Sequence, residues 1–237
     1  KRGLNWYQSF FLNPQSQNSI WIGEASPLYM ESREAMEKIY KYCGDIKIIC
    51  ILRDPIERYL SNIRMAKRNG DIDIDQSRIF TNKLSLLYLK RGLYGKQIQN
   101  IKRIFSDLLI LDFVELKDEK NLKKKLADFF NIDISKFGEI PHTNANISLR
   151  SSTLYKLKRY FARKLRNHLF GNILLNYNPI RKLSKFTDYL NTGKSIKKSD
   201  FEICFNNYCK LKEYYIEDIK ILNQETKNIS FIQNYID

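Results

Sequence analysis

The feature that most constrains this chain is the segment 46–61, with the sequence IKIICILRDPIERYLS. It begins with a run of β-branched and aliphatic residues that is too continuous for a half-exposed strand, which predicts a strand inside a parallel sheet. Asp54 suits an N-cap, Pro55 suits the first helical position, and Glu57 lies where a carboxylate can reach back to the cap. The segment therefore predicts a strand that passes directly into a helix.

Arg53 lies at the junction between this strand and this helix. Open α/β sheets bind anionic ligands at the carboxyl ends of their strands and beside helix N-termini, where a guanidinium can form two hydrogen bonds with a phosphate. Ser61 lies seven residues after Asp54, two turns along the same helix face, so we expect its hydroxyl near the same ligand. From the residues alone a second interpretation stays open, in which Arg53 pairs with a neighbouring carboxylate and Ser61 is only a polar helix residue.

The run RDPIERYLS from Arg53 to Ser61, with an apolar strand before it, resembles the 3′-phosphate-binding motif of sulfotransferases that use 3′-phosphoadenosine 5′-phosphosulfate (PAPS). Five further stretches are similar, in the same order, to segments of the Golgi-type and bacterial carbohydrate sulfotransferases: residues 3–10, 23–29, 92–97, 109–116 and 214–222. The resemblance covers most of the chain. It implies an α/β, P-loop-like fold of three layers, with a central parallel sheet flanked by helices.

The resemblance also implies an activity and a co-substrate. A sulfotransferase moves a sulfuryl group from PAPS to a hydroxyl or amine of an acceptor, here expected to be a carbohydrate. In that reaction, catalysis is expected to come mainly from positioning the reactants and neutralising the developing charge, and no metal is needed. Arg53 and Ser61 would hold the 3′-phosphate. Tyr94, in a stretch similar to the family's Gly-x-Tyr segment, would line the nucleotide site or is instead a packed helix tyrosine.

Further candidate residues are expected to contribute to the same site. Glu24 follows a strand expected at 19–23, where a carboxylate faces the acceptor or assists deprotonation of its hydroxyl; the alternative is an N-cap or a structural hydrogen bond. In the family a late basic loop closes over the nucleotide, and Arg150 and then Lys194 are the candidates for that role. Neither His142 nor His168 is expected to be the base, because the family's histidine base precedes the segment that resembles Arg53.

The chain also departs from the family. Similar sulfotransferases carry a glycine-rich, Pro-Lys-Ser/Thr-Gly-Thr-like loop that cradles the 5′-phosphosulfate, and this sequence contains no such loop. The Lys-Glu pair that often supplies the general base of the glycan enzymes is absent too, and Ala25 stands where they commonly carry a lysine. We therefore expect residues 1–237 to form a single, N-terminally incomplete sulfotransferase-like domain that is inactive on its own. An upstream membrane anchor is compatible with this expectation.

The formal net charge of +15 favours anionic partners. The positive charge is concentrated in residues 140–198, a basic lobe in which no acidic residue occurs between Glu139 and Asp188. The lobe begins with apolar residues at three- and four-residue steps, which predict an amphipathic helix with a cationic face: Leu154, Leu157, Tyr160, Phe161 and Leu165. A solvated face, an acidic glycan acceptor and a membrane surface bearing a lipid-linked acceptor all remain open.

Composition adds outer bounds. A hydrophobic fraction of 43% is ordinary for a globular protein, and no apolar run approaches the roughly 20 residues of a transmembrane helix. The four cysteines show no metal-ligand spacing, so we expect free thiols in a reducing, cytoplasmic compartment, with membrane association left open. Two other functions also remain open. One is a non-catalytic remnant that binds nucleotide or glycan, and the less favoured one is a basic nucleic-acid-binding protein, for which no recognition motif is present.

The remaining pattern alternates helices with apolar strands, which implies a parallel sheet covered on both faces. Further strands are expected at 19–23 and 108–114. Helices are expected at 30–42, 55–69, 84–105 with an interruption near Gly92, 121–130 and 200–222.

Overall fold

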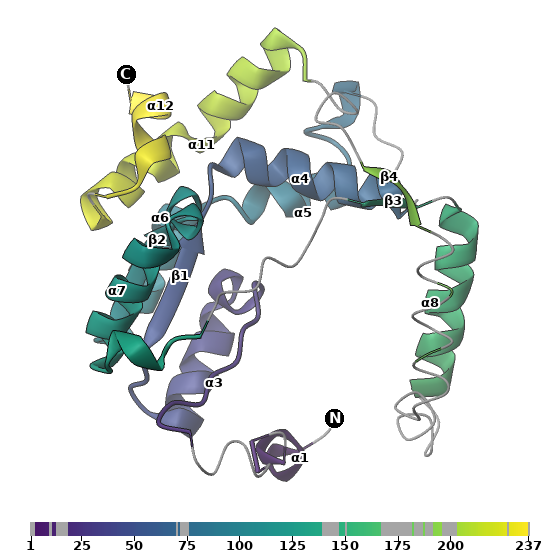
Figure 1. Ribbon diagram of the computed structural model, residues 1–237. Helices are drawn as coiled ribbons and strands as arrows, with labels where there is room; N and C mark the ends of the chain where they lie inside the picture. Colours follow the sequence, from purple (N-terminus) through teal and green to yellow (C-terminus); the bar gives the residue numbers. More distant parts are fainter. Residues whose placement is uncertain are drawn as a thin grey trace.

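The computed structural model describes residues 3–9, 11–12, 19–69, 71, 76–138, 147–149, 151–166, 182, 187, 192–195, 203–226 and 228–236 (Figure 1). Its strands are β1 (Ile48–Leu52), β2 (Leu108–Asp112), β3 (Ile147–Leu149) and β4 (Thr192–Ser195). Its helices are α1 (Leu4–Gln8), α3 (Arg33–Cys43), α4 (Pro55–Arg68), α5 (Lys83–Lys90), α6 (Tyr94–Lys102), α7 (Glu119–Phe130), α8 (Ser152–Arg166), α11 (Phe205–Glu225) and α12 (Gln233–Ile236). Short 3₁₀ turns lie at Tyr29–Glu31, Gln76–Arg78, Phe113–Lys117, Ile134–Lys136 and Ser230–Ile232.

Strands β1 and β2 pair in parallel, with Ile48 beside Leu108 and Leu52 beside Asp112. Both strands were predicted, but the second ends two residues early, because the Asp112 carboxylate accepts a hydrogen bond from the Val114 N–H and a 3₁₀ turn begins there. Since the strands are parallel, their carboxyl ends lie at the same edge of the sheet. The chain segments that leave this edge form the candidate site described below.

The prediction of a strand at 19–23 is wrong. Residues 19–26 contain no regular element, and the side chains of Ile20, Trp21 and Ile22 are exposed. A strand forms only where its N–H and C=O groups find a partner strand, and within the described residues β1 pairs with β2 alone. The apolar composition of this segment was therefore not enough to predict its backbone.

The main hydrophobic core lies on the face of the sheet that carries Cys50 and Leu52. Helices α4, α6 and α11 pack there through fully buried aromatic and aliphatic side chains, which include Tyr59, Ile63, Ile98, Ile101, Leu211, Tyr215, Ile219 and Leu222. The helix expected at 200–222 is observed as α11, and its buried residues begin at Leu211. Phe205 and Tyr208, nearer its start, are exposed.

The opposite face of the sheet is covered only in part by the described residues. Leu111, Leu122 and Ala127 are buried but lie outside the main core, so α7 packs beside β2 (Figure 1). On the neighbouring strand β1 the side chain of Ile51 is 48% exposed. The continuous apolar run had predicted that helices cover both faces of the sheet. This prediction is confirmed for β2 but not for the end of β1.

The start of α4 follows the predicted signals. Asp54 caps α4 by accepting a hydrogen bond from the Glu57 N–H at 3.0 Å, and Pro55 occupies the first helical position. Helix α3 starts three residues later than expected, because the Ser32 hydroxyl caps it by accepting from the Ala35 N–H at 3.1 Å, and it ends before Gly44. The interruption expected near Gly92 separates α5 from α6.

Helix α6 is capped by a side chain from α11. The Asp218 carboxylate accepts hydrogen bonds from the N–H groups of Gly95 and Lys96 at 2.7 and 3.1 Å, which compensates its burial. A Cβ atom on Gly95 would lie 2.3 Å from the Asp218 backbone oxygen. Position 95 therefore has no room for a side chain while the two helices keep this distance.

We predict that Gly95→Ala lowers the free energy of unfolding by about 1–3 kcal/mol, because the extra methyl group forces α6 and α11 apart. This loss outweighs the roughly 1 kcal/mol that alanine gains over glycine within a helix. Gly138→Ala is the control, since a Cβ there meets nothing within 4 Å. Urea unfolding of both variants measures the difference, and equal stability would contradict this packing of α6 on α11.

The cysteines offer a second test of the fold. Cys50 lies inside β1, and burial raises the pKa of its thiol to about 12, whereas Cys43 and Cys204 are exposed. Because the thiolate is the reactive form, we predict that a thiol reagent at pH 8 modifies Cys43 and Cys204 rapidly and Cys50 only on unfolding. Mass spectrometry of the labelled peptides gives the readout. Rapid modification of Cys50 in the native protein would mean that β1 is not in the core.

The second half of the chain contains a separate pair of strands and the predicted amphipathic helix. β3 and β4 are antiparallel, with Leu149 beside Thr192 and Ile147 beside Ser195. Helix α8 extends away from the rest of the molecule (Figure 1), and it confirms the helix expected around residues 154–165. Within the described part of the chain, no helix combines the length and the apolar character that a membrane crossing requires.

Candidate functional site

Arg53 follows β1 directly at the carboxyl edge of the sheet. Its Nη2 atom lies 3.1 Å from Oε2 of Glu57, and its Cζ atom lies 5.1 Å from the centre of the Phe113 ring. The parallel register explains the second contact, because Leu52 and Asp112 are paired and the next residue of each chain segment is Arg53 or Phe113. The Arg53 side chain remains 31% exposed, so a soluble anion can reach it.

Ser61 lies on the same face of α4 as Glu57, one turn further along, and its side chain is half-buried. The core residues Ile56 and Ile63 lie on the other side of this helix. Arg53 precedes α4, and its pair with Glu57 lies on the side of the helix that also carries Ser61. The pairing of Arg53 with a neighbouring carboxylate, which the alternative interpretation expected, is therefore present. A common ligand for Arg53 and Ser61 stays a prediction.

Tyr94 lies behind this edge in the core and is 2% exposed. Burial raises the pKa of its hydroxyl, against the positive charge of Arg58 and against hydrogen bonds from the Arg53 backbone and the Arg58 side chain. The Arg58 guanidinium lies over the Tyr94 ring at 5.5 Å. Tyr94 is thus a packed helix tyrosine that contacts the backbone of Arg53 from within, and its role toward a nucleotide stays a prediction.

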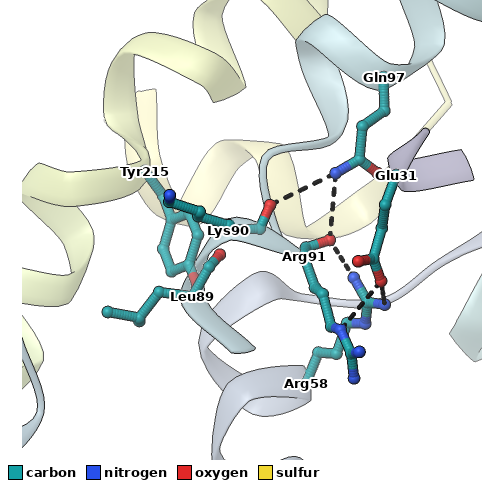
Figure 2. A network of polar contacts seen from close by, with 7 residues as sticks. All are labelled: Glu31, Arg58, Leu89, Lys90, Arg91, Gln97 and Tyr215. Atoms are coloured by element: carbon teal, nitrogen blue, oxygen red, sulfur yellow. Dashed lines mark hydrogen bonds and ion pairs between the residues drawn. The ribbon is translucent and has the colours of Figure 1, made fainter. Parts of the chain in front are cut away.

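A network of polar contacts fastens the turn after α5 to α4 (Figure 2). Arg58 donates a hydrogen bond to the backbone oxygen of Arg91, and the Glu31 carboxylate lies 3.0 Å from Arg91 Nε and 4.0 Å from Arg58 Nη2. Gln97 Nε2 donates to the backbone oxygens of Lys90 and Arg91 at 3.4 and 3.5 Å. These side chains fix the turn that precedes Tyr94. The residue sequence alone gave no signal for the pairing of Glu31 with the two arginines.

Gly92 marks the closest approach in this region. A Cβ atom there would lie 2.8 Å from the Tyr215 ring and 2.9 Å from Pro55 Cβ, so the turn is in direct contact with the start of α4. Tyr215 of α11 donates a hydrogen bond to the Leu89 backbone oxygen at 3.0 Å, so α11 also contacts this turn (Figure 2). The stretch 92–97, which resembles the family's Gly-x-Tyr segment, thus supports the residues that flank Arg53.

The C-terminal segment joins the same edge of the sheet. The Tyr235 hydroxyl donates to Asp54 Oδ1 at 3.1 Å, and the Ser230 N–H and hydroxyl donate to Asp112 Oδ2 at 2.7 and 2.5 Å. Burial raises the pKa of the Asp54 carboxyl, and the hydrogen bonds that it accepts oppose this rise. Sequence reasoning missed both contacts. The available signal was that Asp112 ends an apolar strand and Asp54 comes two residues after one.

We predict that Tyr235→Phe lowers the free energy of unfolding by about 1 kcal/mol, because Asp54 loses a hydrogen-bond donor while remaining largely buried. The pKa of the Asp54 carboxyl should also rise further, since this hydrogen bond lowers it. Chemical denaturation and carboxyl NMR titration are the measurements. Tyr42→Phe, at an exposed tyrosine of α3, is the control and should change neither quantity.

Glu24 lies in the irregular segment before the first 3₁₀ turn and is exposed. It hydrogen-bonds the hydroxyls of Tyr7 and Tyr29. The pKa of Tyr7 is raised by burial and then by Glu24, whereas the pKa of Tyr29 is raised first by its hydrogen bond to Glu24 and then by burial. The structural hydrogen bond weighed as an alternative is therefore present, and a part in catalysis stays a prediction.

The two late basic candidates are only partly described. Arg150 lies outside the described residues, and Lys194 lies in β4 with its side chain outside them. Leu149, which precedes Arg150, pairs with Thr192, and Ser195, which follows Lys194, pairs with Ile147. Neighbours of both candidates therefore belong to one antiparallel strand pair. This strand pair lies toward the C-terminal end of α4 (Figure 1), whereas Arg53 precedes the N-terminal end of that helix.

The remaining sequence candidates add little to the site. His142 and His168 lie outside the described residues. Among the residues that the structure does describe, no group of three or more His, Cys, Asp or Glu side chains is arranged to hold a metal ion.

Comparison with known proteins gives partial sequence matches, and no protein-family model matches the chain. Human heparan sulfate glucosamine 3-O-sulfotransferase 3B1 is 29% identical over 111 residues, which are 44% of this chain and 28% of that protein. The membrane-associated sulfotransferase kil1 of Dictyostelium discoideum is 34% identical over 80 residues, 32% of this chain and 17% of that protein. The matched region thus spans less than a third of either relative.

Among solved structures, a sulfotransferase from Alicyclobacillus acidocaldarius is similar with a TM-score of 0.52 and 18% identity, over 76% of this chain and 74% of that one. This match confirms the predicted class of fold, the P-loop-like α/β fold with a parallel sheet between helices. With the curated relatives, it also confirms the resemblance to the sulfotransferase family that the run from Arg53 to Ser61 had indicated.

Proposed function

We propose that the protein is a sulfotransferase that moves a sulfuryl group from PAPS to a hydroxyl or amine of a carbohydrate acceptor. The observation that carries the proposal is the junction of β1 and α4, where the partly exposed Arg53 pairs with Glu57 on the helix side that also carries Ser61. The relatedness to heparan sulfate glucosamine 3-O-sulfotransferases supports both the reaction and a glycan acceptor.

Arg53 and Ser61 would bind the 3′-phosphate of the donor. The Asp54 carboxylate already accepts hydrogen bonds from the N–H groups of Ile56 and Glu57, so the contacts to the phosphate fall mainly on side chains. The exposed pair of Arg53 with Glu57 contributes only about 0–1 kcal/mol, so a doubly charged phosphate can replace the carboxylate. Two parallel hydrogen bonds from the guanidinium would then hold the phosphate in one orientation.

The reaction that we propose forms a bond between the acceptor oxygen or nitrogen and the sulfuryl sulfur. The sulfur–oxygen bond to 3′-phosphoadenosine 5′-phosphate (PAP) breaks, and the acceptor's proton passes to a base. Glu24 is the candidate for this base, held in place by Tyr7 and Tyr29. Arg53 and Ser61 act away from the sulfur and contribute binding and orientation. The chemistry of this transfer does not require a metal ion.

The other parts of the proposal concern the surroundings of the donor. Tyr94 would support the nucleotide site through its contact with the Arg53 backbone, and Arg150 and Lys194 are candidates for closing over the nucleotide. The acceptor would be an acidic or lipid-linked glycan, whereas nucleic acid is not the expected partner. A cytoplasmic location is proposed from the free, exposed thiols of Cys43 and Cys204.

The decisive prediction is that Arg53→Ala weakens the binding of PAP by about 2 kcal/mol, roughly 30-fold, because it removes a charge-assisted hydrogen bond to the phosphate. Arg33→Ala is a matched control. Arg33 likewise pairs with the glutamate four residues later, Glu37, but it lies on α3 and not at the junction of β1 and α4. Isothermal calorimetry with PAP, on protein whose circular dichroism shows an intact fold, measures both variants.

Unchanged affinity of the Arg53 variant for PAP, or an equal loss of affinity in the Arg33 variant, would contradict the proposed donor site. Transfer of radiolabelled sulfate from PAPS to glycans, measured on the complete protein, separates an enzyme from a remnant that binds nucleotide without turnover. Salt-sensitive binding to a random oligonucleotide, without binding to PAP, would instead support the nucleic-acid alternative.

A further inference from the structure

Helix α8 carries exposed apolar side chains. Leu154, Leu157, Tyr160 and Phe161 are 47%, 51%, 60% and 52% exposed. With 3.6 residues per turn, Leu154, Leu157 and Phe161 lie within one sector of the helix, and Tyr160 lies beside that sector. Apolar side chains gathered on one face are typical of a surface that another body covers.

The cationic side chains of α8 surround this sector and extend over the opposite face. Lys158 and Lys164 lie on its two borders, and Lys156 and Arg159 lie on the far side. No acidic residue occurs between Glu139 and Asp188 in the sequence. An apolar face bordered by lysines and free of carboxylates matches the interface of an anionic bilayer, where apolar side chains enter the acyl boundary and lysines reach the headgroups.

One ion pair shows how α8 is oriented. Arg159 Nη1 lies 3.3 Å from Asp71 Oδ2, just beyond the C-terminal end of α4, and the Arg159 guanidinium also lies over the Tyr155 ring at 5.6 Å. Phe161 comes two residues after Arg159, which is ~200° around the helix axis. The Arg159 side of α8 therefore faces the segment after α4, and Phe161 lies on roughly the opposite side of the helix.

We propose that α8 is a docking surface for an anionic lipid bilayer, which it binds parallel to the membrane plane through Leu154, Leu157 and Phe161. A soluble polyanion would use the positive charge and leave the apolar sector in water, so the combination of both favours a bilayer. This inference does not depend on the proposed sulfuryl transfer, because it uses no residue of the donor site.

The experiment uses the full chain and two kinds of vesicle, one of phosphatidylcholine mixed with phosphatidylserine and one of phosphatidylcholine alone. Co-sedimentation at low and moderate salt should show binding to the mixed vesicles and little binding to phosphatidylcholine alone. The double variant Leu157→Gln/Phe161→Gln should bind the mixed vesicles about tenfold more weakly or worse. Its control is Ile134→Gln/Phe205→Gln, which removes two exposed apolar side chains elsewhere and should bind normally.

A second pair of variants tests the charge. Lys164→Gln, on the border of the apolar sector, should weaken binding to the mixed vesicles about fivefold. Lys124→Gln removes the same charge from an exposed position of α7 and should have a much smaller effect. Both substituted positions are exposed, so the fold should survive, as circular dichroism can verify.

Several outcomes would overturn the proposal. Full vesicle binding by the Leu157 and Phe161 variant, with equal binding to a soluble sulfated polysaccharide, would assign α8 to acidic polymers. Self-association in sedimentation velocity without lipid, lost in the same variant, would assign the face to a second copy of the chain. Absence of binding to the mixed vesicles would show that α8 does not bind an anionic bilayer.

Discussion

The parallel pairing of β1 with β2 is the constraint on which the rest of the structure depends. Because Leu52 lies beside Asp112, the chain leaves both strands at the same level, and Arg53 meets Phe113 there. A shift of one residue would turn Cys50 and Leu52 out of the core and move Arg53 away from the start of α4. Burial of apolar side chains thus fixes the position of a charged one.

The carboxyl edge of this sheet is supported from behind by close contacts between backbones. A side chain at position 92 would meet Pro55 and Tyr215, and one at position 95 would meet the backbone of Asp218. The two glycines therefore permit the turn before α6 to approach α4 and permit α6 to approach α11. A movement of one of these helices would therefore also move its neighbours, because closely packed interiors transmit strain. The resemblance to the family in this stretch therefore reflects the support of the site as much as contact with a ligand.

The sequence predicted those parts of the fold and site whose signals are local. The Asp54 cap, the proline after it and the spacing from Arg53 to Ser61 define a strand, a helix start and one helix face within sixteen residues. The strand at 19–23 was wrong because a strand depends on a distant partner. The pairing of Glu31 with Arg91 was missed for a similar reason, since it joins segments sixty residues apart and leaves no periodic pattern.

The fastening of Asp54 and Asp112 by Tyr235 and Ser230 has a consequence for the order of assembly. A ribosome makes both aspartates more than a hundred residues before their partners. Helix α4 and both strands can thus form while the two carboxylates at their ends still face water. The edge that carries Arg53 therefore receives its full set of polar contacts only after residue 235 has been made.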